Sequence, residues 1–131
     1  MSILALMTAL LGSNWSTTCI MTQSNGLQGY TIDQVSFEKN PTNKNLETTF
    51  TRTWFEDQNC SVEKSASTEK ASLTVGSRIN PTTFEADWNF NQKLELGAIA
   101  VSEDGKSLRM ATTSFGSSRN TMLSLFSYFS K

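Results

Sequence analysis

The chain has 131 residues and a formal net charge of −1, so it suits a single domain and lacks the basic field typical of nucleic-acid-binding proteins. It contains no histidine, which removes the commonest general base and the commonest metal ligand. Eight Phe and three Trp accompany abundant Thr, Ser and Asn but only two Pro, a composition typical of β-rich proteins. We therefore expect an all-β fold with no cofactor, no metal site and no nucleic-acid partner.

The chain opens with an apolar stretch, MSILALMTALL. It resembles the apolar region of a signal peptide, but it has no basic flank and no A-x-A cleavage site follows it. It is too short to span a bilayer. Residues 1–12 are therefore either a signal remnant or a short helix that packs on the rest of the protein, with Gly12 as its C-terminal cap. Residues 13–131 are expected to form one β domain, and lipid anchoring stays open.

Clusters of Gly, Pro, Asn and Asp recur along the rest of the chain, with the spacing of an all-β sandwich or barrel. About eight strands joined by sequential hairpins close into an up-and-down antiparallel barrel, which leaves no free sheet edge. The predicted strands cover residues 14–22, 30–38, 46–56, 60–65, 70–76, 84–91, 94–102, 107–113 and 122–130. The last of these is apolar on both faces, and the N-terminal segment is expected to cover its outside.

Cys19 and Cys60 are the two cysteines, and neither belongs to a C-x-x-C pair. Without histidine they make a poor zinc site. In an exported protein they would form a disulfide, whose loop of about forty residues would stabilise the fold by about 4 kcal/mol. The alternative is two free, buried thiols in a cytosolic protein.

Two strands raise the question of which face is buried. In YTIDQVSFE, Tyr30 and Ile32 alternate out of phase with Val35 and Phe37, and a β-bulge at residues 33–34 would turn all four inward. In FEADWNFN the alternation is strict, because Glu85 and Asp87 share the wet face and the opposite face is apolar. That apolar face carries Phe84, Ala86, Trp88 and Phe90. The paired carboxylates are therefore expected on a solvated wall rather than in a glycosidase-like site.

Arg52 lies between Phe50 and Trp54, and all three side chains project from one face of a strand. If that face lines the barrel, the guanidinium needs an anion, and a ligand carboxylate or phosphate could supply it in bidentate geometry. Two alternatives remain. Arg52 pairs with an internal Glu, or it stacks on Trp54 at the outer surface.

Several motifs together resemble small exported bacterial proteins of the lipocalin-like (calycin) group: GSNWSTTC at the first strand, TFTRTWFEDQNCS in the middle, and a late DWN before an aromatic end. The resemblance implies that Trp15 packs across the closed end of the barrel, under a basic residue from near the last strand. Arg119 matches that residue, with Arg109 as the second choice. It also implies that Cys19 is tied to the later D-x-x-C stretch that ends at Cys60.

The function predicted on this basis is binding of a small apolar or amphipathic ligand by an exported, periplasmic, outer-membrane-associated or extracellular protein. The alternative is a structural or protein-interaction module of the envelope, inhibitor-like, with a filled barrel. We expect no enzyme, because the chain has neither a histidine base nor a G-x-S-x-G motif. The candidate ligand-binding residues are Phe50, Arg52, Trp54, Phe84, Trp88 and Phe90.

Overall fold

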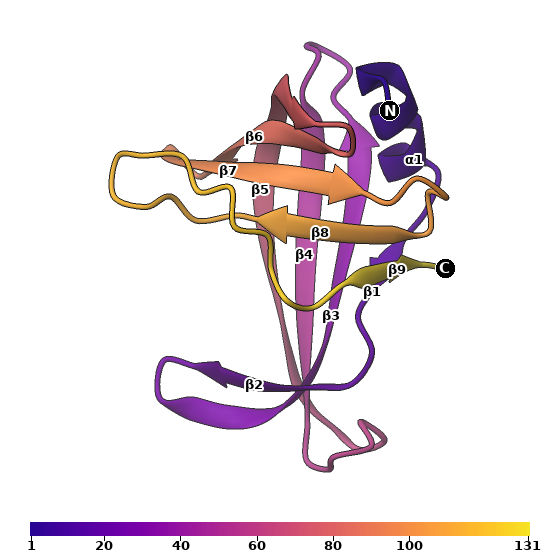
Figure 1. The fold of residues 1–131 in the computed structure, drawn as a ribbon. Helices are drawn as coiled ribbons and strands as arrows, with labels where there is room; N and C mark the ends of the chain where they lie inside the picture. Colours follow the sequence, from indigo (N-terminus) through magenta and orange to yellow (C-terminus); the bar gives the residue numbers. More distant parts are fainter.

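The computed structural model describes residues 1–131 and contains one helix and nine strands (Figure 1). The elements, in chain order, are α1 (Ile3–Leu11), β1 (Trp15–Ser16), β2 (Ile20–Ser24), β3 (Leu27–Lys39), β4 (Leu46–Phe55), β5 (Glu63–Asn80), β6 (Thr83–Phe90), β7 (Lys93–Val101), β8 (Ser107–Ala111) and β9 (Tyr128–Ser130).

The strands form a closed antiparallel β-barrel, as the sequence predicts. From β3 to β9 each strand pairs with the next, and β1 closes the ring because it pairs with β9 on one side and with β3 on the other. Eight strands therefore make up the ring. β2 lies outside it and pairs only with the first half of β3, in a hairpin whose turn residues Asn25 and Gly26 both have positive φ.

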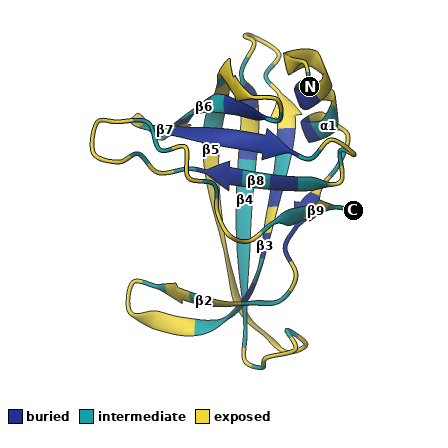
Figure 2. Cartoon of the chain, viewed as in Figure 1, coloured by how far each residue is buried: buried dark blue, intermediate teal, exposed yellow.

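The strands differ greatly in length, and this difference shapes the molecule. β3 has 13 residues and β5 has 18, whereas β8 has 5 and β9 has 3. The long strands therefore continue past the end of the ring. The β2–β3 hairpin and the β4–β5 connection project below it (Figure 1), and this projecting part is largely exposed (Figure 2). We call the projecting parts of β2, β3, β4 and β5 the open wall.

The other end of the ring is filled with apolar side chains and capped by α1. Leu6 and Leu10 of the helix are fully buried and belong to the same core cluster as Trp15 and Trp88. The Ser2 hydroxyl accepts a hydrogen bond from the Ala5 amide at the helix start, and Gly12 follows its last turn. Of the two alternatives for the N-terminal segment, the structure shows the packed helix.

Trp15 is fully buried, and its indole Nε1 donates to the Leu10 carbonyl oxygen at 3.4 Å. The expected cover by Arg119 is wrong. The Arg119 guanidinium donates to Asp87 Oδ1 at 2.7 Å and lies 3.3 Å from Glu85 Oε2, on the outer face of β6. Those two carboxylates hold Arg119 outside the ring, and helix α1 takes the place expected for the arginine.

Several strand predictions also need correction. The predicted 14–22 strand is two short strands, β1 and β2, and the predicted 60–65 and 70–76 strands are one continuous strand, β5. Only residues 128–130 of the last predicted strand pair, and α1 packs against β3 instead of covering it. Many side chains between Met122 and Phe126 are exposed, so this apolar stretch does not build the wall.

The bulge predicted at residues 33–34 is absent. β3 and β4 keep an uninterrupted register from Tyr30 to Lys39, with Asp33 opposite Arg52. The inward face of β3 therefore carries Thr31, Asp33 and Val35, all buried, whereas Tyr30 and Ile32 are only partly buried. An inward aspartate is acceptable here because it has a charged partner across the strand pair.

The predicted disulfide between Cys19 and Cys60 is confirmed, with the two Cα atoms 5.8 Å apart. Cys19 directly precedes β2, and Cys60 lies in the connection between β4 and β5. The bond therefore ties the start of β2 to the far end of the open wall.

Gly97 allows a close approach between β7 and the end of β8. The Trp88 indole Nε1 donates to the Ala111 carbonyl oxygen at 2.9 Å, which satisfies a polar group that is otherwise fully buried. This carbonyl passes directly over Gly97, and a Cβ added there would lie 1.8 Å from its oxygen. Position 97 therefore has no room for a side chain.

We expect Gly97→Ala to lower the free energy of unfolding by about 3 kcal/mol, because the added methyl group must displace either Ala111 or Trp88. Gly105→Ala is the matched control. Gly105 has φ +72°, and no atom lies within 4 Å of the point that a Cβ would occupy, so only a backbone cost of about 1 kcal/mol is expected. Urea unfolding followed by Trp fluorescence measures both; equal losses would contradict the close approach.

Candidate functional site

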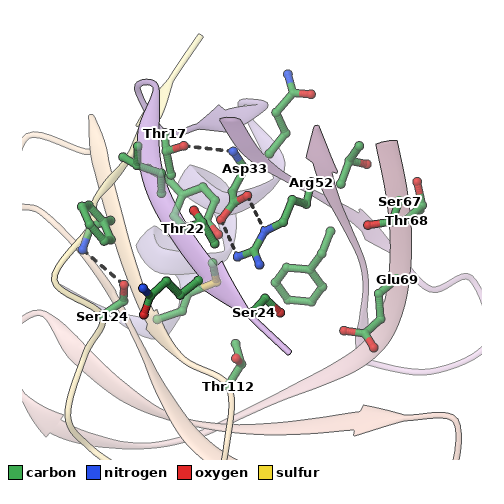
Figure 3. Close-up of a pocket in the computed structure, with 18 of the residues that line it drawn as sticks. Thr17, Thr22, Ser24, Asp33, Arg52, Ser67, Thr68, Glu69, Thr112 and Ser124 are labelled. Carbon is green, nitrogen blue, oxygen red and sulfur yellow. Dashed lines mark hydrogen bonds and ion pairs between the residues drawn. The ribbon is translucent and has the colours of Figure 1, made fainter. Parts of the chain in front are cut away.

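A cavity of about 760 Å³ lies where the packed ring opens onto the open wall. It is lined on one side by β2 and on the other by β5, with β3 and β4 between them and the C-terminal segment at its edge. Figure 3 shows its side chains pointing toward one another from these elements. The cavity is open to solvent on one side, so it is accessible to a small molecule.

An ion pair lies at the boundary between cavity and core. Arg52 Nε and Nη2 donate to the two carboxylate oxygens of Asp33, each at 2.9 Å (Figure 3). The Asp33 side chain is 12% exposed and that of Arg52 is 36% exposed. The Asp33 amide also donates to Thr17 Oγ1 at 3.0 Å. The two hydrogen bonds to the charged carboxylate raise the pKa of Arg52.

Arg52 thus faces the barrel interior, but its anion belongs to the protein. The prediction that Arg52 would bind an anionic ligand group is replaced by the alternative in which it pairs with an internal acid, although the partner is Asp33 rather than the expected Glu. Trp54 is also close, with its ring centroid 5.9 Å from the guanidinium carbon, on the inner surface. The bidentate geometry uses Nε and Nη2, so an incoming carboxylate would have to compete with Asp33.

Tyr128 of β9 packs beside this pair. Burial away from water, together with the negative charge of Asp33, raises the pKa of the Tyr128 hydroxyl to about 12. Tyr128 is the register partner of Leu108, which is fully buried, so the tyrosine ring points into the barrel. It closes the side of the cavity opposite the open wall.

Aromatic side chains form the apolar part of the cavity. The Phe50 and Phe90 ring centroids are 5.9 Å apart, and Phe50 also lies 5.7 Å from the Trp88 ring. Phe50 and Phe90 line the cavity, whereas Trp88 is fully buried behind them. This group therefore joins the filled core to the cavity surface. Ile20, Met21, Met110 and Phe126 complete the apolar lining.

Polar side chains cover the rest of the surface. Thr22 and Thr31 share a hydrogen bond of 2.7 Å between their hydroxyl oxygens. Ser67 and Glu69 project from β5 on the side facing Asp33 and Arg52, and Figure 3 draws no interaction from Glu69 to any neighbour. The cavity is therefore amphipathic, with the rings of Phe50 and Phe90 beside hydroxyl and carboxylate groups.

The six candidate ligand-binding residues fall into two groups. Phe50, Arg52 and Phe90 line the cavity, but the other three do not. Phe84 and Trp88 are buried in the filled part of the ring, at 3% and 0% exposure. The Trp54 ring is partly buried and packs against Gly29, with ring carbons 3.1 Å from the point that a Cβ on that glycine would occupy.

Sequence reasoning missed Asp33, Glu69 and Tyr128. Asp33 was hidden because an alternation based on apolar residues placed it on the outer face. Glu69 lies in a strand half without apolar residues, so only its register opposite Phe50 reveals its direction. The position of Asp33 opposite Arg52 would have become evident once the β3–β4 register was known.

No family model, curated protein or solved structure matches the chain. The described residues contain no group of three or more His, Cys, Asp or Glu side chains that could hold a metal ion. No helix in the structure combines the length and apolar character needed to cross a bilayer. The site must therefore be interpreted from its own geometry.

A double-mutant cycle tests the ion pair. Arg52→Met should lower the free energy of unfolding by about 3 kcal/mol, because it leaves the Asp33 carboxylate mostly buried without a partner. Asp33→Leu should cost only about 1 kcal/mol, since the more exposed Arg52 can turn to water. The double variant should lose less free energy of unfolding than Arg52→Met alone. Additive losses in urea unfolding would show that the two charges do not interact.

Because the pKa of Tyr128 is raised, we expect the protein to lose stability at alkaline pH. Above the ordinary pKa of 10.0 the unfolded chain releases this proton, while the folded protein holds it until about pH 12. Stability that is complete below pH 10 should therefore fall as the pH rises to 12, by roughly 2 kcal/mol more in the wild type than in Tyr128→Phe. Urea unfolding of both proteins at about pH 9 and about pH 11.5 measures the difference; parallel losses would contradict the buried hydroxyl.

Proposed function

We propose that the protein is an exported binding protein that holds a small apolar or amphipathic ligand in the cavity between the ring and the open wall. The observation that carries this proposal is the cavity itself. Its volume of about 760 Å³ falls within the range of ligand pockets, which is about 300 to 1,000 Å³. The closed β-barrel architecture is compatible with such binding.

The ring alone would not hold such a ligand. A barrel of about eight strands is just wide enough either to fill with side chains or to enclose one small molecule. Here Trp15, Trp88 and the α1 leucines fill it, and the cavity lies where the long strands extend beyond the ring, with Phe90, Met110 and Tyr128 of the ring in its lining. The proposed site is therefore an open cup at one end of a filled barrel.

The disulfide supports the exported location, because such bonds persist in oxidising compartments. It also supports the cup, since it holds β2 near the end of the β4–β5 wall. We propose binding rather than catalysis, because Asp33 and Arg52 neutralise each other in the cavity.

A protein-interaction role is the second candidate. The segment from Met122 to Phe129 leaves four large apolar side chains exposed by 47% or more. Such groups gathered on one segment are typical of a contact surface for another protein. They are Met122, Leu125, Phe126 and Phe129.

The neutral fluorescent dye N-phenylnaphthylamine tests the cavity. We expect it to bind the wild type and Ser67→Trp to weaken its binding about tenfold, because the indole would occupy the cavity from β5. Ala66→Trp is the matched control, since the neighbouring residue is exposed and does not line the cavity. Absence of dye binding to the wild type, or equal weakening by both variants, would argue for the protein-interaction role.

A further inference from the structure

We propose that this cavity selects ligands with a positively charged group, which binds between the Glu69 carboxylate and the rings of Phe50 and Phe90. The inference rests on the proposed binding function and specifies its ligand class. It reverses the charge that Arg52 suggested from the sequence.

The balance of charges around the cavity gives the first reason. Three charged side chains line it: Asp33, Arg52 and Glu69. Asp33 and Arg52 form a bidentate pair with two contacts of 2.9 Å, so their charges cancel at short range. Glu69 makes no hydrogen bond and no salt bridge within the protein. Asp87, by contrast, is paired with Arg119. The cavity therefore offers one uncompensated negative charge.

The position of Glu69 gives the second reason. It is the register partner of Phe50 across the β4–β5 pair, and the buried residues Ala71 and Leu73 follow it on the same face of β5. Its side chain and the Phe50 ring thus project to the same side of the sheet. Figure 3 shows the Glu69 carboxylate on the side of the cavity away from the β3 strand that carries Asp33.

The aromatic rings complete the site. An ammonium group next to Glu69 would also lie near the aromatic rings of Phe50 and Phe90, which line the cavity with centroids 5.9 Å apart and attract a cation placed over their faces. The alkyl part of the ligand could then contact the apolar lining formed by Ile20 and Met110. Carboxylate, aromatic face and apolar surface together are the complement of a cationic amphiphile.

An anionic ligand would bind less favourably in this cavity. To reach the Arg52 guanidinium it would have to displace Asp33, which would leave a mostly buried carboxylate without its partner. It would also be repelled by Glu69. Arg109, the next arginine near the cavity edge, donates to the Ser124 and Leu123 carbonyl oxygens and is held there by the C-terminal segment.

Three compounds with the same alkyl chain test this selection: decyltrimethylammonium, decanol and decanoate. Each displaces N-phenylnaphthylamine from the wild type, and the displacement is followed by the dye's fluorescence. We expect the cation to bind about fivefold more tightly than decanol, and decanoate to bind more weakly than decanol. Added salt should reduce the advantage of the cation, because Glu69 is exposed to solvent.

Glu69→Gln and its matched control Glu63→Gln identify the residue responsible. Both side chains are exposed on β5 and both substitutions remove one negative charge, but only Glu69 lines the cavity. Glu69→Gln should abolish most of the cation's advantage and leave decanol binding unchanged, whereas Glu63→Gln should alter neither. Neither variant should unfold more readily than the wild type.

The outcomes separate the two proposals. If decanol and the dye bind but decanoate binds as tightly as the cation, or if Glu69→Gln leaves the cation's advantage intact, the charge selection is wrong and the binding function stands. If neither the dye nor decanol binds the wild type, the binding function itself is wrong, and the charge selection falls with it.

Discussion

The ion pair between Asp33 and Arg52 divides the interior of this barrel into two parts. On one side most inward residues are apolar and buried, among them Val35, Trp88 and the α1 leucines. On the other side β2 and β3 carry the hydroxyl groups of Thr22 and Thr31, and the interior opens into the cavity, which also reaches past the pair to Phe50 and Glu69. A carboxylate is tolerated at this depth only because a guanidinium on the neighbouring strand supplies two hydrogen bonds. The pair therefore ends the hydrophobic core and forms one boundary of the site.

Unequal strand lengths turn that boundary into a usable surface. β3, β4 and β5 continue beyond the ring, while β8 and β9 stop, so one wall of the barrel extends alone. An extended sheet that packs on only one side has little apolar burial to stabilise it. The Cys19–Cys60 bond compensates by joining β2 to the connection between β4 and β5. The cup therefore depends on a covalent link, whereas the ring depends on its packed core.

The sequence predicted the closed barrel and the disulfide from local signals, whereas the burial of Trp15 was expected from the resemblance of its motif to the lipocalin-like group. Strict alternation marks β6, and two cysteines without other metal ligands favour a bond. The inward direction of Asp33 had no such signal, since apolar alternation assumes that charged residues face water. β5 was divided in two because its first half has no apolar alternation at all. The inward direction of Glu69 and Tyr128 follows only from cross-strand register, which depends on contacts distant in the sequence.

Closure of the ring depends on β1, a strand of two residues in which Trp15 pairs with Ser130 and Ser16 pairs with Phe129. These contacts join the first strand of the chain to the last, the most distant pairing that the topology contains. Because loop-closure entropy opposes such contacts, a barrel of this kind folds slowly compared with helical domains of similar size. Until β9 is in place, the edges of β8 and β3 are unpaired on this side and can associate with other chains. A chaperone that covers these edges would protect the chain during that interval.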